Sequence, residues 1–520
     1  MFADLLSREA GPAWALAFGI LALFYVVRRV ITDYQLKKIG GVRAPVLATN
    51  PLFSLPIFLY AGWKQMNNRL LEFFDAIYWV ATPECPNTVE IAVNGGTRFL
   101  LTRNPEHIKT ILTTKFAEFG KGPRFHKIWS PFLGDSIFTT DGRIWSDCRS
   151  LIRPMFVKDR VRDLDIFQKW TDKLISKMPG SGETVEMMDL FYRMTLDVTT
   201  DFLLGDSIHS LENTNHEFVQ AFQEVQRLQM LQTILVPLEP IFPQYRYKRG
   251  IRILEKFMEP YIHKTLALTP DELEKLSKSD KDFTFLHNIA RFTRDPKVIR
   301  DQLMAVLIAG RDTTAATLSW TIYELANYPT IYRKLRNEII HNLGTNRTPT
   351  YEDLKNMTYL THTLNETLRL YPAVPFNTRA ALEDTSLPGE PGQPDIAVRK
   401  GDAVVYSALS MQRRRDLYPA PSEKFADPAV FSPDRWASWT PKAWHYLPFN
   451  GGPRVCVGQN FAMTEMACTM VRLLQRYERL EYRGNWKAQY HRAEIVGCPG
   501  HGVPVAFFRA QPEVARVPSV

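Results

Sequence analysis

The hydrophobic pattern begins with a short apolar run near the N-terminus, and amphipathic segments follow along the rest of the chain. No residue from Ala10 to Val27 is charged, and this run is just long enough to span a bilayer as a helix. A cleaved signal peptide is the alternative, but the start of the chain is mixed in charge and the run ends in Arg28 and Arg29. We therefore expect a retained anchor. More basic residues follow the run than precede it, which places the rest of the chain in the cytoplasm, at the cytosolic face of the endoplasmic reticulum in a eukaryote.

Shorter patterns predict local elements further along the chain. Residues 52–63 are apolar but too short to span and contain a proline, so they either enter the membrane surface or pack on the core. Residues 88–102 predict a β-hairpin, because two β-rich runs flank Asn94-Gly95-Gly96. Residues 211–268 predict two helices around a proline-bearing connection at 234–243, and residues 497–500 (Gly-Cys-Pro-Gly) predict a turn.

One helix stands out by its length. The run between Pro296 and Pro329 contains no internal proline and predicts a helix of about thirty residues, well beyond the usual length. Its middle reads Ala-Gly-Arg-Asp-Thr-Thr over residues 309–314, where glycine and consecutive threonines are poor helix formers. Such choices in an otherwise sound helix favour a functional site, although a tolerated packing defect is the simpler alternative.

Composition limits the class of protein. The chain has 520 residues with 45% hydrophobic content and no linker-like segment, which predicts one large domain behind the N-terminal segment. The net charge of +9 comes from scattered basic residues, so we predict no nucleic-acid binding; a membrane or an acidic protein partner suits it better. The five cysteines are an odd number without CxxC spacing, which indicates a reducing compartment rather than a disulfide framework.

Candidate chemistry centres on Cys456. Gly451, Gly452 and Pro453 predict a tight turn before it, and an apolar run that starts at Phe461 predicts a helix after it. A cysteine just before a helix N-terminus is favoured as a thiolate. A lone cysteine is more often a small buried hydrophobe, but the glycines, proline and arginine packed around this one favour a ligand.

The loop resembles the haem-ligand loop of the cytochrome P450 monooxygenases, which is similar in Phe449, Gly452, Arg454, Cys456 and Gly458 and in their spacing. Further motifs of that family occur in the family's order over about 145–458. They are Trp145-x-x-x-Arg149, Ala309-Gly310-x-Asp312-Thr313, Glu366-x-x-Arg369 and Pro433-x-Arg435.

The resemblance implies a fold that is mainly α with small β-sheets. It implies an anchor at 1–30, a membrane-proximal linker at 31–64 and a catalytic domain at 65–520. It also implies haem b, with the Cys456 thiolate as the iron ligand. The residues expected to bind the haem, including its propionates, are Trp145, Arg149, Arg379, Phe449 and Arg454.

The resemblance also assigns roles on the long helix and behind the loop. Gly310 leaves room beside the iron, Thr313 donates a hydrogen bond to dioxygen, and Asp312 relays protons. Glu366, Arg369 and Arg435 form a buried structural triad. Asp434 and Trp436 replace the glutamate and phenylalanine that are commoner beside that arginine.

The reaction implied is insertion of one oxygen atom of O2 into a lipophilic substrate. The chain has no dinucleotide-binding fingerprint, so a separate NADPH–cytochrome reductase is expected to supply the electrons.

Several short sequence motifs resemble those of the fungal alkane and fatty-acid hydroxylase branch, and this resemblance favours an aliphatic chain as the substrate. A tailoring oxidase of a fungal secondary-metabolite pathway is the alternative. An O2-independent haem-thiolate isomerase is more remote, because Asp312 and Thr313 are both present. A non-enzymatic haem sensor is the other remote alternative.

Overall fold

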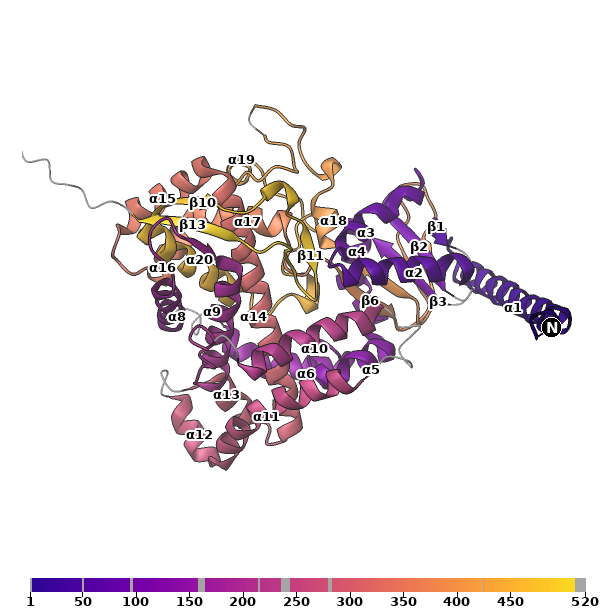
Figure 1. Ribbon diagram of the computed structural model, residues 1–520, viewed down its shortest axis with the longest axis horizontal. Helices are drawn as coiled ribbons and strands as arrows, with labels where there is room; N and C mark the ends of the chain where they lie inside the picture. Colours follow the sequence, from indigo (N-terminus) through magenta and orange to yellow (C-terminus); the bar gives the residue numbers. More distant parts are fainter. Residues whose placement is uncertain are drawn as a thin grey trace, which may run out of the picture. The chain divides into compact units, whose positions relative to one another are not determined.

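A computed structural model describes residues 2–48, 51–93, 97–157, 164–213, 216–234, 244–278, 283–423 and 425–509 (Figure 1). The chain is mainly helical with small β-sheets, as predicted. Its contacts define two units. The sheet unit contains Met1–Lys64, Glu72–Gly122 and Phe376–Ser407, and the helical unit contains Gln65–Leu71, Pro123–Pro375 and Ala408–Val520.

The helices account for most of the described chain. In chain order the α-helices are α1 (Phe2–Ile39), α2 (Pro51–Met66), α3 (Leu70–Ala76), α4 (Pro105–Lys109), α5 (Gly122–Leu133), α6 (Gly142–Ile152), α8 (Asp165–Ser176), α9 (Met187–Leu204), α10 (Glu217–Ile234), α11 (Tyr245–Ala267), α12 (Pro270–Ser277), α13 (Phe285–Phe292), α14 (Pro296–Asn327), α15 (Pro329–Leu343), α16 (Tyr351–Asn356), α17 (Thr358–Leu370), α18 (Ala408–Gln412), α19 (Arg435–Ser438) and α20 (Gln459–Arg476). Short 3-10 or π turns are η1 (Ile77–Val80), η2 (Thr110–Thr114), η3 (Phe116–Glu118), η4 (Arg153–Phe156), η6 (Arg415–Leu417), η7 (Gly452–Arg454) and η8 (Trp486–Ala488).

The strands form four small sheets. They are β1 (Val46–Ala48), β2 (Thr88–Val93), β3 (Thr97–Thr102), β4 (Phe119–Gly120), β5 (Thr184–Glu186), β6 (Asn377–Ala381), β7 (Thr385–Leu387), β8 (Ile396–Val398), β9 (Ala403–Tyr406), β10 (Tyr477–Tyr482), β11 (His491–Ala493), β12 (Gly497–Pro499) and β13 (Pro504–Arg509). The sheet unit holds a six-stranded sheet in the order β1-β2-β3-β9-β6-β4 and the β7–β8 pair; the helical unit holds the β10-β13-β5 sheet and the β11–β12 hairpin.

Local predictions can be compared directly with these elements. The hairpin at 88–102 is confirmed as the antiparallel pair β2–β3, although its tip at 94–96 lies outside the described residues. The two helices predicted over 211–268 are α10 and α11, and the connection at 235–243 also lies outside them. The predicted turn at 497–500 is wrong for three of its residues, because 497–499 pair with β11 as strand β12 and tertiary pairing overrides the Gly-Pro turn signal.

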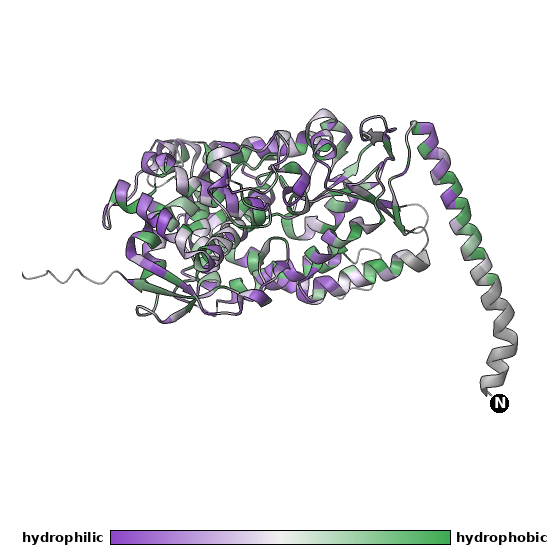
Figure 2. Ribbon diagram, turned by 90° about the horizontal axis from the view of Figure 1, so that it is seen from above, coloured by the Kyte–Doolittle hydropathy of each residue, from purple (hydrophilic) through white to green (hydrophobic). Residues whose placement is uncertain are grey.

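The N-terminal helix α1 is continuous from Phe2 to Ile39, so the predicted anchor boundary at residue 30 falls inside it; the three-part domain division stays a prediction. Figure 2 shows green, hydrophobic residues recurring along the coloured part of α1. Its last turns are fixed to the sheet unit, where Thr32 and Leu36 are buried. Within the described residues, no helix combines the length and apolar character needed to cross a membrane, and a transmembrane helix over Ala10–Val27 is therefore not shown.

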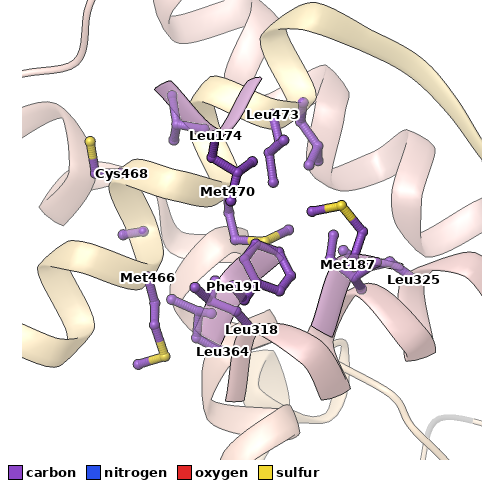
Figure 3. Packing of buried hydrophobic residues seen from close by; sticks show 14 of the residues in the cluster. Leu174, Met187, Phe191, Leu318, Leu325, Leu364, Met466, Cys468, Met470 and Leu473 are labelled. Carbon is purple, nitrogen blue, oxygen red and sulfur yellow. The ribbon is translucent and has the colours of Figure 1, made fainter. Parts of the chain in front are cut away.

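The long helix α14 confirms the prediction for residues 296–329. Pro296 occupies its first turn, and the Asp295 side chain caps it by accepting from the backbone N–H groups of Lys297 and Val298. The core of the helical unit packs around its second half. Figure 3 shows side chains from five helices converging there, which are Leu174 of α8, Met187 and Phe191 of α9, Leu318 and Leu325 of α14, Leu364 of α17, and Met466, Met470 and Leu473 of α20.

Phe191 is fully buried at the centre of this cluster. Replacing it by alanine removes a large apolar side chain and leaves a cavity, so we expect Phe191→Ala to lower the free energy of unfolding by about 3–5 kcal/mol. Urea unfolding of the haem-loaded protein measures this. The exposed Phe292 of α13 is the matched control, because Phe292→Ala empties no core site. Equal effects of the two substitutions would contradict the packing.

Candidate active site

The loop before α20 holds Cys456 by its own backbone. The Cys456 N–H donates to the Phe449 carbonyl (2.9 Å), and the Val455 N–H donates to the Gly452 carbonyl (3.0 Å). Asn450 and Gly452 adopt left-handed conformations, with φ of 63° and 62°, which asparagine and glycine tolerate best. These residues turn the chain tightly and set the cysteine just ahead of the first turn of α20.

The Cys456 thiol is an accessible group with protein on most sides. This partial removal from water raises the pKa of the Cys456 thiol, while the Gly458 N–H and the charge of Arg149 act against the shift. The predicted stabilisation of a thiolate by the helix start is therefore present but outweighed. A metal cation at the sulfur reverses this balance, because a coordinated thiol is deprotonated.

Three of the predicted haem-binding side chains gather beside this loop in the helical unit. The Arg454 guanidinium carbon lies 4.6 Å from the centre of the Trp145 ring, and that of Arg149 lies 5.9 Å from it. Arg454 also donates to the Thr140 carbonyl (3.0 Å) and to Asp141 Oδ1 (2.7 Å). Two guanidinium groups and an indole N–H suit a pair of carboxylates such as the propionates of haem.

Arg379 belongs to the sheet unit. It lies on β6, is 3% exposed, and donates from Nη1 to Asn377 Oδ1 (2.9 Å) and to the Thr378 carbonyl (2.8 Å). Its role at a propionate stays a prediction, as do the haem contacts assigned to Phe449, Trp145, Arg149 and Arg454.

A narrow strip of α14 is accessible while the rest of that stretch is buried. From residue 301 to residue 326, every residue is buried except Ala309, Gly310 and Thr313. Ala309 and Thr313 lie one turn apart on the same face of the helix, and Gly310 follows Ala309 directly. The Thr313 hydroxyl donates to the Ala309 carbonyl one turn earlier (2.7 Å), so its lone pairs remain available to accept.

Close packing between two helices explains why position 310 is a glycine. A Cβ atom at this position would lie 2.9 Å from Oγ1 of Thr199 on α9, closer than side chains tolerate. Glycine therefore allows α9 and α14 to cross closely. Its predicted place beside the iron stays a prediction.

Asp312 is a buried carboxyl group with an unusual affinity for its proton. Burial raises the pKa of Asp312 to about 6, although Arg311, whose Nη1 lies 3.0 Å from Oδ1, lowers it. The Arg311 guanidinium in turn lies between the rings of Tyr192 (5.1 Å) and Phe222 (5.2 Å). Gln226 of α10 also interacts with the carboxyl, and no sequence motif points to it.

The predicted structural triad is assembled in full. Both oxygens of Glu366 bond to arginines: Oε2 accepts from Arg369 Nε (2.8 Å) and Oε1 from Arg435 Nε (2.9 Å). Trp436 Nε1 adds a further donor to Oε2 (2.9 Å), and the Ser432 N–H adds one to Oε1 (2.9 Å). Tryptophan in place of phenylalanine therefore supplies a hydrogen bond to a buried carboxylate.

Sequence reasoning missed Glu465, a second buried carboxyl group. It lies on α20, nine residues after Cys456, is 1% exposed and lies near Thr314, the neighbour of Thr313. Burial raises its pKa well above the ordinary value. A single acid in the apolar run Phe-Ala-Met-Thr-Glu-Met-Ala was a signal that could have found it.

An accessible cysteine behind a glycine-rich loop, two arginines beside it and a partly exposed threonine on a long buried helix are the components of the predicted haem-thiolate site. The residues fit the group, because a soft thiolate donor, cationic partners for propionates and a polar hydroxyl for oxygen are all present. With haem bound, Cys456 would ligate the iron and Arg149 and Arg454 would bind the propionates.

Similarity to known proteins covers nearly the whole chain. The profile described as Cytochrome P450 matches residues 51–495. The protein named cytochrome P450 monooxygenase pvhE of Talaromyces variabilis is 42% identical over 511 residues, with 93% of each chain covered. Cytochrome P450 52A10 of Candida maltosa is 38% identical, with 94% of this chain and 96% of the relative covered. Cytochrome P450 52A13 of Debaryomyces hansenii is 36% identical, with 90% and 92% covered.

A solved structure, the haem domain of cytochrome P450DA, has the same fold. Its TM-score is 0.69 at 20% sequence identity, with 85% of this chain and 92% of that chain covered. The chain belongs to the cytochrome P450 family. It is a monooxygenase with haem as cofactor and a cysteine thiolate on the iron, and the predicted family, enzyme class and cofactor are confirmed.

The triad generates a stability prediction. Glu366→Gln leaves two buried arginines without a counter-charge, and we expect it to cost about 3–5 kcal/mol of unfolding free energy. Trp436→Phe removes one hydrogen bond to a charged group and should cost about 1.5–3 kcal/mol. Denaturant unfolding measures both, with Trp439→Phe as the control for a neighbouring indole that is not bonded to Glu366. A neutral Glu366→Gln would contradict the ionic role.

Because the pKa of Asp312 is raised in the folded protein, the free energy of unfolding should depend on pH. Between its ordinary value of 3.8 and its folded value of about 6, the folded protein holds a proton that the unfolded chain has released. Stability from this group is therefore complete below about pH 4 and falls as pH rises to about 6, by about 3 kcal/mol at most. We expect the unfolding free energy of wild type to fall over this interval relative to that of Asp312→Asn. A parallel course of the two curves would contradict burial of the free acid.

Proposed function

We propose that this enzyme hydroxylates the aliphatic chain of a lipophilic substrate such as an alkane or a fatty acid. The accessible strip of Ala309, Gly310 and Thr313 on α14 is the observation that carries the proposal of oxygen insertion, because the hydroxyl of the predicted oxygen-activating Thr313 is not enclosed by the protein. The similarity to the 52A relatives agrees with the branch that the sequence motifs resemble, and this supports an aliphatic substrate.

The haem group supplies activation of O2, and its thiolate ligand favours cleavage of the O–O bond. The chain's own residues manage protons and water. Asp312 can take up and release a proton at a pH of about 6, because burial raises its pKa to about that value. Thr313 must release its hydrogen bond to the Ala309 carbonyl before its hydroxyl can donate elsewhere. The carbonyl bond keeps the hydroxyl oxygen at the accessible strip until then.

Members of this family take electrons from a separate redox partner and bind O2 and an apolar substrate. For this chain the proposed partner is an NADPH–cytochrome reductase on the same membrane. Exposed apolar side chains support attachment at the cytosolic face of the endoplasmic reticulum. They are Leu16, Ile20, Leu23, Phe24, Val27, Val30 and Ile31 on α1, and Leu55, Leu59, Tyr60 and Trp63 on α2.

A second candidate is a tailoring oxidation in a fungal secondary-metabolite pathway. One observation favours it, because the relative with 42% identity, pvhE, has a name outside the 52A group. The two candidates differ in the shape of the substrate and not in the oxygen chemistry.

The test is turnover of the reconstituted enzyme with its reductase, NADPH and either a long alkane or a fatty acid. We expect a hydroxylated chain as product. Thr313→Ala should form several-fold less product and more hydrogen peroxide, because proton delivery to oxygen is impaired. Thr317→Ala, one turn later on the same helix and buried, is the matched control.

Two further readouts separate the outcomes. Cys456→Ala should lose the red-shifted band of the reduced carbon monoxide complex, and Cys468→Ala, a buried cysteine of α20, should keep it. Absence of chain hydroxylation in a protein that shows this band, together with a spectral shift on adding polycyclic compounds, would replace the proposal by the tailoring candidate.

A further inference from the structure

Four oxidisable rings lie in contact in the helical unit, apart from the residues assigned to the haem. Trp320 of α14 stacks on Tyr371, with ring centres 3.9 Å apart and planes 5° from parallel. Tyr323 lies 5.5 Å from Trp320, and Tyr482 of β10 lies 5.3 Å from Tyr323. The series Tyr371, Trp320, Tyr323 and Tyr482, called the aromatic chain here, is therefore continuous, with ring centres never more than 5.5 Å apart.

One end of the aromatic chain is close to the accessible strip of α14. Trp320 is 2% exposed and lies seven residues beyond Thr313 in the same helix, about 10 Å along its axis. One turn before Trp320 on the same face is Ala316, which packs with Ala373 and Cys498. The aromatic chain thus begins within electron-transfer distance of the region assigned to oxygen activation.

The other end reaches the surface. Tyr482 is partly exposed, and its hydroxyl accepts a hydrogen bond from Gln489 (3.3 Å). The Tyr323 hydroxyl donates to the carbonyl of Trp486 (3.2 Å), whose own ring is 56% exposed. Electrons from a reductant in solution can therefore enter at this end.

A proton acceptor is already in place inside the cluster. A tyrosine that loses an electron also releases its phenolic proton, and the Tyr371 hydroxyl donates to Glu324 Oε1 at 2.5 Å. Glu324 is 6% exposed, so this proton stays inside the protein. His491 packs edge-on against both Trp320 (5.2 Å) and Tyr371 (5.8 Å), which holds the stacked pair in position.

We propose that the aromatic chain carries oxidising equivalents from the haem site to the protein surface and so protects the enzyme when substrate is not oxidised. Trp320 gives one electron to a one-electron oxidant formed at the haem. It regains an electron from Tyr371, whose proton moves to Glu324 and returns when that electron is restored, or, across the Tyr323 ring, from Tyr482, whose partly exposed hydroxyl releases its proton to water. A thiol or ascorbate in solution returns one electron and one proton to the Tyr482 radical. The inference rests on the proposed function only in requiring a haem-derived oxidant.

The test mixes the ferric haem-loaded enzyme with hydrogen peroxide in the absence of substrate and freezes it within milliseconds to seconds. Electron paramagnetic resonance should show tryptophan and tyrosine radicals. Trp320→Phe should give several-fold less radical and several-fold faster haem bleaching. Tyr371→Phe, which keeps a stacked ring but removes the hydroxyl, should lower the tyrosine signal and leave the tryptophan signal.

Tyr332→Phe is the matched control, because Tyr332 is a buried tyrosine with a hydrogen-bonded hydroxyl, and none of the described ring contacts joins it to the aromatic chain. Tyr482→Phe tests the outer end at a partly exposed position. It should slow the quenching of the internal radicals by added thiol several-fold.

The possible results separate cleanly. A normal carbon monoxide band without a protein radical in wild type overturns the inference and leaves the proposed function intact. So does a radical yield that is equal in wild type and Trp320→Phe, or quenching that is unchanged in Tyr482→Phe. Loss of the carbon monoxide band in wild type would instead contradict the haem-thiolate site itself.

Discussion

The constraint on which this structure depends is that several ionisable side chains are shielded from the water that would stabilise their charged forms. Cys456, Asp312 and Arg149, three of the residues predicted at the haem site, lie in surroundings that disfavour their charged forms. Burial raises the pKa of the first two and lowers that of the third. Neighbouring groups act against each shift: the Gly458 N–H and Arg149 at Cys456, Arg311 and Gln226 at Asp312, and Cys456 at Arg149. Coordination of a metal cation would favour the thiolate form of Cys456 against this effect of burial.

The same constraint explains the buried triad behind the loop. Glu366 is fully buried, but two guanidinium groups, an indole and a backbone N–H satisfy its oxygens. Removing one partner would leave a charge in a medium that does not solvate it. The triad therefore ties the segment around Ser432, Arg435 and Trp436 to helix α17.

Helix α14 links the separate parts of the helical unit. Its first turns are capped, its middle presents the accessible strip, and its second half contributes both to the methionine-rich core and to the aromatic chain. Because one helix carries all of these, the distances between oxygen activation, core packing and the aromatic chain are set by helical rise alone. The poor helix formers in its middle are tolerated because tertiary contacts, such as that between Gly310 and Thr199, stabilise the helix there.

Short-range chemistry in the sequence was sufficient for the family, the cofactor, the long helix and the hairpin, because glycine turns, periodicity and i,i+3 or i,i+4 spacing express themselves within a few residues. Tertiary structure alone decided the rest. Gln226 and Arg311 at Asp312, Asp141 at Arg454, and the stack of Trp320 on Tyr371 join residues whose pairing no local pattern records. Strand β12 shows the same limit, since pairing with β11 overrode a clear turn signal. A pKa likewise depends on which atoms exclude water, and this is a property of the folded chain that residue order does not state.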